Sequence, residues 1–148
     1  MADSLFKVGV LGATGFIGSP YREEIRECKE AEIVAVCARR QDLLDRAAGE
    51  DQARLATRNW REVVEHPDVN FVIVGTPDAL HHEAVVSCAA QGKHLLCEKP
   101  VGMNAAEAEE MWGLYREAQP ALAHFVPFWT RMVGVFEIAR DVVGSGEL

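Results

Sequence analysis

Short apolar runs alternate with amphipathic segments along this chain, and the alternation is its clearest structural signal. The run Phe71–Val74 is apolar at every position, as expected for a strand whose sheet is covered by helices on both faces. Other segments carry apolar residues at helical spacing, for example Ile17, Tyr21, Ile25 and Cys28. Strands and helices that alternate in this order predict a doubly wound parallel α/β sheet.

We predict a Rossmann-type doubly wound parallel sheet of about six strands with helices on both faces. The strands are expected at residues 6–11, 32–38, near 55, 71–74, 95–97 and 121–126. The helices are expected at residues 17–28, 41–48, 60–65, 83–91 and 105–118, with a further helix between 127 and 148. Gly49 and Gly92 are the expected stops of two helices, and Asn59 and Asn104 are the expected caps of two others.

A glycine-rich turn follows the first predicted strand, with the spacing G-x-x-G-x-x-G. Its first glycine permits a tight turn, its second lets the backbone approach a pyrophosphate, and the helix after it offers N–H donors and a partial positive charge. Such a turn also ends strands for steric reasons alone, but between a strand and a helix it predicts a dinucleotide site. The candidate cofactor-binding residues in this turn are Gly12, Thr14, Gly15, Phe16 and Ile17.

The second predicted strand ends in Ala38, Arg39 and Arg40. A fold that binds NAD usually has an acidic residue here for the ribose 2′-hydroxyl, and an acid would repel the 2′-phosphate of NADP. A small neutral residue followed by two guanidinium groups suits that phosphate instead, so the sequence favours NADP over NAD. The alternative is that both arginines are ordinary surface charges and that Asp42, or nothing, meets the ribose.

Two further candidate groups follow later strands, at the edge of a parallel sheet where ligands bind. Thr76 and Pro77 follow the strand 71–74, and Glu98 and Lys99 follow the strand 95–97. At this edge Lys99 is expected to stand at a cofactor site rather than on a solvated face. Because the turn must aim this lysine from a strand end, we expect the bond between Lys99 and Pro100 to be cis.

A histidine pair, His81 and His82, begins the helix after Thr76 and Pro77. Adjacent residues on a helix point about 100° apart, and no third ligand has a suitable spacing, so we expect no metal site. His81 is expected to act as a hydrogen-bonding residue at the start of the helix and is a further candidate cofactor-binding residue.

The segments VNFVIVGTPDALHHEAVVSCAAQGKH and GKHLLCEKP resemble the glucose-fructose oxidoreductase, inositol dehydrogenase and MocA (Gfo/Idh/MocA) family of nicotinamide-dependent oxidoreductases. The resemblance covers nearly the whole chain. It implies that Lys99 hydrogen-bonds the reacting oxygen and assists proton transfer, that Glu98 orients this lysine or the cofactor, and that Thr76 and Pro77 pack under the dinucleotide. It also matches His81 to a recurrent histidine. The chain departs from the family pattern at Thr14, where a glycine is common, and at Asp78, where asparagine is usual.

The resemblance implies an NAD(P)-dependent dehydrogenase or reductase that transfers hydride to or from a hydroxyl-bearing carbon of a sugar, a cyclitol or a related small molecule. Residues 1–126 would form the NAD(P)-binding domain, and 127–148 would begin a second, substrate-binding domain that is otherwise absent, so the chain alone is expected to be inactive. One alternative is a nucleotide-binding sensor or regulatory domain without turnover. Another is a different dehydrogenase on the same sheet, which leaves Glu98, Lys99 and Pro100 unexplained.

Composition narrows the class of partner. The 148 residues carry a net charge of −8, so nucleic acid is an unexpected partner. No apolar run is long enough to span a bilayer and no signal peptide precedes the first strand, which predicts a soluble, cytoplasmic protein. Cys28, Cys37, Cys88 and Cys97 form no C-x-x-C pair and are expected to be reduced and mostly buried.

The last predicted helix carries more apolar residues than a helix exposed to solvent is expected to have. Trp129, Met132, Phe136, Ile138 and Val142 would be covered by a second domain in a longer relative, and left bare they form a patch larger than monomers tolerate. We therefore expect a homo-oligomer that associates through the carboxyl-terminal helix, the alternative being that this segment is mobile.

Overall fold

The computed structural model describes residues 5–118, 120–128 and 133–146, and its centre is one parallel sheet of six strands. The strands are β1 (Phe6–Leu11), β2 (Ala31–Cys37), β3 (Leu55–Thr57), β4 (Phe71–Val74), β5 (His94–Cys97) and β6 (His124–Phe125). Their order in the sheet is β3-β2-β1-β4-β5-β6. The chain therefore leaves β1 in one direction and returns past it to β4, which confirms the doubly wound topology and puts its switch point between these two strands.

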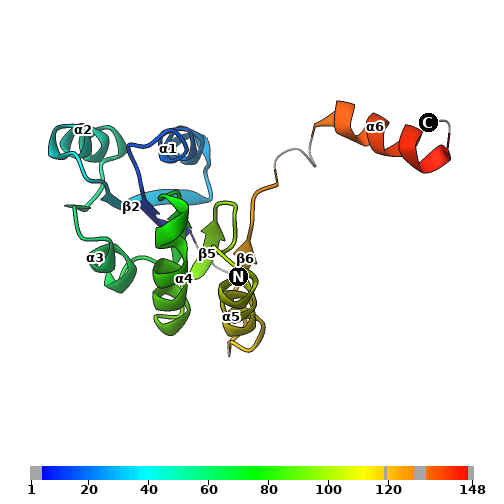
Figure 1. Ribbon diagram of the computed structural model, residues 1–148. Coiled ribbons are helices and arrows are strands. Elements are labelled where there is room, and N and C mark those ends of the chain that lie inside the picture. The colour runs from blue at the N-terminus through cyan, green and yellow to red at the C-terminus, as the bar shows by residue number, and fades with distance from the viewer. Residues whose placement is uncertain (1–4, 119, 129–132, 147–148) are drawn as a thin grey trace.

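Helices cover both faces of the sheet (Figure 1). The helices are α1 (Gly18–Glu27), α2 (Gln41–Asp51), α3 (Trp60–Glu65), α4 (His81–Ala90), α5 (Ala105–Arg116) and α6 (Gly134–Ser145), with a short 3-10 turn, η1 (Asp78–Leu80), before α4. Side chains of α1 and α2 pack on one face, and those of α3, α4 and α5 pack on the other.

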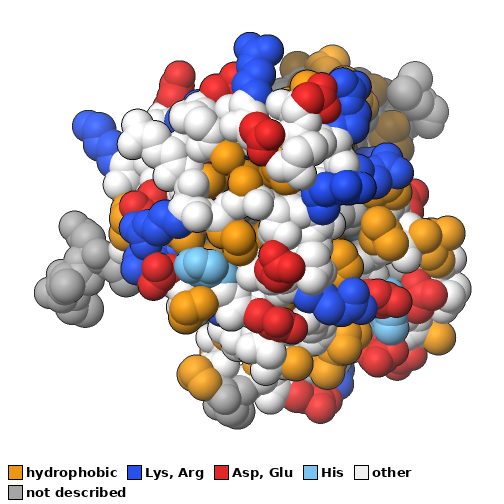
Figure 2. All heavy atoms as spheres, turned by 90° about the vertical axis from the view of Figure 1, so that its left-hand side faces the viewer, with side chains coloured by type: hydrophobic (Ala, Val, Ile, Leu, Met, Phe, Trp, Pro, Cys, Tyr) orange, Lys and Arg blue, Asp and Glu red, His pale blue; other side chains and the backbone are white. Residues whose placement is uncertain are grey.

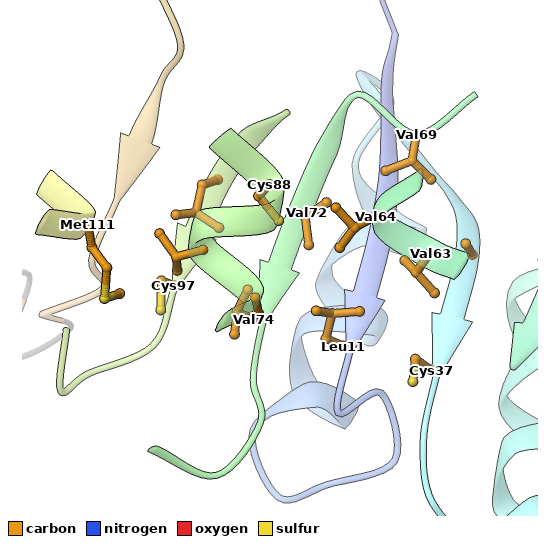
Figure 3. Packing of buried hydrophobic residues seen from close by; sticks show 14 of the residues in the cluster. Leu11, Cys37, Val63, Val64, Val69, Val72, Val74, Cys88, Cys97 and Met111 are labelled. Atoms are coloured by element: carbon orange, nitrogen blue, oxygen red, sulfur yellow. The ribbon is translucent and has the colours of Figure 1, made fainter. Parts of the chain in front are cut away.

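The continuous apolar run in β4 is explained by this arrangement. Val72 and Val74 pack with α3, α4 and α5, while Ile73, which points the other way, packs on the α1 and α2 side. Figure 3 shows Val63 and Val64 of α3 beside the strands that they cover. Because both faces of this strand are buried, an alternating polar pattern would be unfavourable there.

Two predicted boundaries are wrong, for local reasons. Gly49 does not stop α2, which continues to Asp51 and ends at Gln52 in a left-handed conformation with φ 53°. A glycine inside a helix costs about 1 kcal/mol, which the contacts of the following turn outweigh. The last strand is shorter than the predicted 121–126, because only His124 and Phe125 pair with the four-residue strand β5.

The cysteines are free and mostly buried, as predicted. Cys37, Cys88 and Cys97 are buried, whereas Cys28 follows the end of α1 and is exposed. Burial, with a smaller effect from the charge of Glu62, raises the pKa of Cys37 to about 11. The buried thiols therefore pack as small apolar side chains.

Helix α6 lies apart from the sheet and its covering helices (Figure 1). No residue of α6 is buried, and Val135, Ile138 and Val143 expose 64 to 66% of their surface. Of the predicted apolar patch, Trp129 and Met132 lie outside the described residues. None of the described helices has the length and the apolar character needed to cross a membrane.

Arg22 ties α1 to α2 from a buried position. It is 5% exposed and donates to the carbonyl oxygen of Ala47 at 3.1 Å, to Glu50 at 3.0 Å and to the fully buried carboxylate of Asp51. Arg26 also reaches Asp51, at 2.7 Å. Burial acts to lower the pKa of Arg22, but the hydrogen bonds and charges of Asp51 and Glu50 outweigh it and hold this pKa above its usual value.

Replacing Arg22 with methionine should therefore destabilise the chain by about 2–4 kcal/mol, because Asp51 would keep only Arg26 as a charged partner. Urea unfolding followed by circular dichroism measures this difference. The matched control is Arg46→Met, which breaks an exposed pair with Glu50 and should cost less than about 0.5 kcal/mol. Equal midpoints for the two variants would contradict the anchoring role of Arg22.

Candidate functional site

A cleft of about 650 Å³ opens where strands β1, β2, β3 and β4 end, a volume typical of small-molecule sites. Nine of the predicted cofactor-binding residues line it: Gly12, Thr14, Gly15, Phe16, Ile17, Arg39, Arg40, Thr76 and Pro77. The other described residues of its wall are Cys37, Ala38, Leu43, Arg58, Trp60, Gly75 and Leu80. None of these wall residues is acidic, although the chain carries 23 aspartates and glutamates against 15 lysines and arginines.

The glycine turn is fixed by close backbone contacts. Gly12 has φ +79°, and a Cβ atom there would lie 2.4 Å from the carbonyl oxygen of Gly75. A Cβ atom at Gly18 would lie 2.2 Å from the carbonyl oxygen of Gly12. The amide groups of Gly12 and Ala13 both donate to the carbonyl oxygen of Cys37 at 3.0 Å, which locks the turn against β2. No side chain caps α1, but the amide of Ser19 donates to the carbonyl oxygen of Gly15 at 3.1 Å and Pro20 has no N–H. Of the first three residues of this helix, Gly18 therefore offers its amide to an anion, together with the partial positive charge of the helix start.

Thr76 carries an unpaired polar atom in the wall of the cleft. Its Oγ1 is buried and is the one such side-chain nitrogen or oxygen without a hydrogen-bond partner in the described part of the chain. A buried hydroxyl without a partner costs about 1–3 kcal/mol, so the free protein holds this group at a penalty that a ligand oxygen or nitrogen would relieve.

Three arginines stand at the β2 and β3 side of the cleft. Arg39 and Arg40 follow β2, and Arg58 directly follows β3, the neighbouring strand. Arg40 is engaged by Asp42, with contacts of 2.8 and 3.3 Å, and this hydrogen bond lowers the pKa of Asp42. On the side of the molecule that faces the viewer in Figure 2, basic and acidic side chains are interspersed, so the acid-free wall is a local feature of the cleft.

Arg58 and Trp60 are wall residues that the sequence did not single out. The segment 50–58 has no clear periodicity, and Arg58 reaches the cleft only because β3 pairs with β2 in the sheet. The available signal was the strand order of doubly wound sheets, which places the end of the third strand beside the end of the second.

His81 lies beneath the cleft rather than in its wall. It is fully buried, and its ring nitrogens contact two carbonyl oxygens, Nε2 that of Thr76 and Nδ1 that of Pro100, each at 2.9 Å. Since both partners are acceptors, a neutral ring with one N–H donates to one of them at a time. His81 thus joins the turn after β4 to the turn after β5, whereas His82 contacts Glu110 of α5 instead.

Glu98 and Lys99 stand at the end of β5, outside the wall of the cleft. Glu98 is 8% exposed, and its carboxylate accepts a hydrogen bond from the hydroxyl of Tyr21 at 2.7 Å and one from the amide of Lys99 at 3.2 Å. Burial, together with the hydrogen bond and the charge of Glu98, raises the pKa of Tyr21, so this phenol remains a donor. Lys99 itself is exposed, and the bond between Lys99 and Pro100 is cis, as predicted. The sequence placed Tyr21 only on the apolar side of a helix and missed its contact with Glu98.

A doubly wound sheet with a glycine turn at its switch point defines a dinucleotide-binding domain of the Rossmann type. Residues 6–124 match the family model described as "Oxidoreductase family, NAD-binding Rossmann fold" (GFO_IDH_MocA). The chain belongs to this family. This confirms the family that the segments around Thr76 and Lys99 indicated.

Individual relatives agree with the family match. The chain is 34% identical over 142 residues to trans-1,2-dihydrobenzene-1,2-diol dehydrogenase of Bos taurus, covering 95% of this chain and 42% of the relative. An NAD-binding oxidoreductase of Klebsiella pneumoniae is 27% identical and superimposes with a TM-score of 0.80, covering 96% of this chain and 39% of that one. A scyllo-inositol dehydrogenase of Lactobacillus casei, solved with NAD(H) and scyllo-inositol, shares the fold with a TM-score of 0.84 at 23% identity, over 97% of this chain and 42% of that one. The chain thus spans about two fifths of the length of these proteins.

The contact between Gly12 and Gly75 gives a direct test of the turn. Gly12→Ala should prevent cofactor binding and destabilise the chain, because the new Cβ atom would meet a carbonyl oxygen in a conformation that alanine avoids. Gly49→Ala is the matched control, since Gly49 lies in α2 with open space around it, and it should stabilise the chain by about 0.5–1 kcal/mol. Thermal unfolding and a cofactor titration measure both effects. An alanine at position 12 that binds cofactor normally would contradict the role of this turn.

Proposed function

We propose that this chain is the cofactor-binding part of an NAD(P)-dependent dehydrogenase that acts on a hydroxyl-bearing carbon of a sugar, a cyclitol or a related small molecule. The observation that carries the proposal is the cleft at the switch point, which combines a glycine turn with a wall free of acidic residues. Two of the relatives named above are dehydrogenases of a diol and of an inositol, which supports this function over a sensor without turnover.

The residues of the cleft fit a dinucleotide. The close-packed turn at Gly12 and the uncapped start of α1 suit a pyrophosphate, and the unpaired hydroxyl of Thr76 offers a hydrogen bond to the cofactor. When it is bound, the nicotinamide cofactor supplies the group that accepts or donates hydride. Arg39 in the wall, without an acid at the end of β2, favours NADP over NAD, whereas Arg40 lines the same wall but is paired with Asp42.

Lys99 is proposed as the residue that handles the proton of the reaction. At the end of β5 its side-chain nitrogen would hydrogen-bond the reacting oxygen of the substrate, taking the hydroxyl proton as a neutral amine in oxidation and returning it as an ammonium group in reduction. Glu98 supports this role by fixing the amide of Lys99, and Tyr21 fixes Glu98 in turn. Lys99 is thus the proposed catalytic residue, and Tyr21 and Glu98 position it.

The proposed domain division follows the same boundaries as the sequence analysis. Residues 1–126 form the NAD(P)-binding domain, and 127–148 begin a second domain that holds most substrate contacts in the full-length enzyme. The separation of α6 from the sheet and the share of each relative that the chain covers both support this division.

Titration with NADPH and NADH, followed by the fluorescence of Trp60 in the cleft wall, tests the proposed function. Thr76→Val sharpens the test, because it removes the unpaired hydroxyl and keeps the shape of the side chain. It should stabilise the free chain by about 1–2 kcal/mol and weaken cofactor binding about 3- to 10-fold. A chain that binds neither cofactor would overturn the proposal.

Thr57→Val is the matched control for Thr76→Val. The hydroxyl of Thr57 accepts a hydrogen bond from the amide of Asn59 at 3.0 Å, so this variant should lose stability and keep its affinity for cofactor. Stability shifts of the same sign in both variants would contradict the interpretation of the Thr76 hydroxyl.

We also propose that this chain forms homo-oligomers through α6, whose apolar residues are exposed. Sedimentation should show a dimer or a larger species. Deleting residues from Pro127 onward should return the chain to a monomer with unchanged cofactor affinity. Replacing the exposed Ile138 of α6 by the substitution Ile138→Glu should have the same effect. At roughly 100 μM, an association free energy of about 5–6 kcal/mol is enough to populate a dimer. An intact chain that remains monomeric at this concentration would refute the proposal.

A further inference from the structure

Two arginines of the cleft differ from all other arginines that the structure describes. Arg22, Arg26, Arg40, Arg46, Arg54, Arg61, Arg116 and Arg140 each pair with an aspartate or a glutamate. Arg39 and Arg58 pair with no acidic side chain among the described residues, and both line the cleft. In a chain with a net charge of −8, two unpaired guanidinium groups in one wall are a local excess of positive charge.

The sheet brings these two arginines together. Cys37 pairs with Thr57 in the register of β2 and β3, and the amide of Ala38 donates to the carbonyl oxygen of Thr57 at 3.3 Å. Arg39 and Arg58 therefore leave neighbouring strand ends, which lie about 5 Å apart in a sheet. Two guanidinium groups on neighbouring strand ends are within reach of one shared anion, which would offset their mutual repulsion.

The position of the pair within the sheet identifies the part of the ligand that it meets. The glycine turn follows β1, and β2 and β3 lie beyond β1 on the side away from β4. A pyrophosphate at the turn therefore directs one nucleoside of a dinucleotide toward β2 and β3 and the other toward β4. An anionic group at Arg39 and Arg58 belongs to the first nucleoside, and a phosphate monoester, with a charge of about −1.5 to −2 at neutral pH, suits two guanidinium groups.

We propose that Arg58, together with Arg39, binds the phosphate monoester on the adenosine ribose of NADP(H) and that Arg58 decides the preference for this cofactor. The inference rests on the proposed function and refines it, because Arg40, which the sequence paired with Arg39, is already engaged by Asp42. Arg40 contributes little to the phosphate site, since binding there would require it to leave a carboxylate.

Single replacements with glutamine test this assignment in the intact chain. Arg58→Gln and Arg39→Gln should each lower the affinity for NADPH about 10- to 100-fold in calorimetric titrations. This is the loss expected for a hydrogen bond between charged groups. The affinity of these two variants for NADH should change less than about threefold. In Arg40→Gln the affinities for both cofactors should change less than about threefold, which is within the usual variation of such hydrogen bonds. The affinity for the fragment 2′,5′-ADP should fall in the same variants as the affinity for NADPH. The affinity for 5′-AMP should stay nearly unchanged, like the affinity for NADH.

Arg54→Gln is the matched control, because Arg54 precedes β3 at the opposite end of the strand and pairs with Glu32 and Asp68. It removes the same charge from the chain and should leave the ratio of the two affinities unchanged. Equal losses of NADPH and NADH in Arg58→Gln, or no loss of either, would overturn the assignment to Arg58 while leaving the proposed function intact. A parent chain that binds neither cofactor overturns the proposed function itself.

Discussion

Two stretches of backbone meet so closely at the end of β1 that no side chain fits between them. Gly12 turns through a left-handed conformation against the carbonyl group of Gly75, and Gly18 packs in the same way on the carbonyl group of Gly12. These contacts therefore fix the end of β1, the end of β4 and the start of α1 relative to one another. Since the cleft opens between these three elements, its shape follows from a contact that only glycine permits.

Around this contact, polar side chains tie the ends of the other strands together. Tyr21 of α1 holds Glu98 after β5, and Arg22, the next residue, holds α2 through Asp51. Neighbouring side chains on one helix thus contact two different elements, the end of α2 and the turn after β5. The helix that begins beneath the glycine turn therefore contacts both α2, which follows Arg39 and Arg40, and the turn that carries Lys99.

Local sequence patterns predicted most of the fold and part of the candidate site. The apolar run Phe71–Val74 and the glycine turn are visible in the sequence because period, composition and turn chemistry agree over a few neighbouring residues. The end of α2 was misjudged because the local cost of Gly49 is small beside tertiary contacts. Tyr21 and Glu98 are 77 residues apart, and Arg58 depends on which strand lies next to β2. Such partners are set by topology, and no short window of sequence contains them.

The buried ring of His81 links the turn at the cofactor cleft to the turn that carries Lys99. It contacts the carbonyl group of Thr76 on the cofactor side and that of Pro100 beside Lys99, so one rigid group touches both turns. A ligand that shifts one turn shifts the energy of the other through this ring. Thermodynamic coupling is reciprocal: the factor by which a dinucleotide changes the affinity for a molecule at Lys99 equals the factor in the reverse direction. The two contacts of His81 thus link the turns through one coupling factor shared by both ligands, and a factor of one would mean that they bind independently.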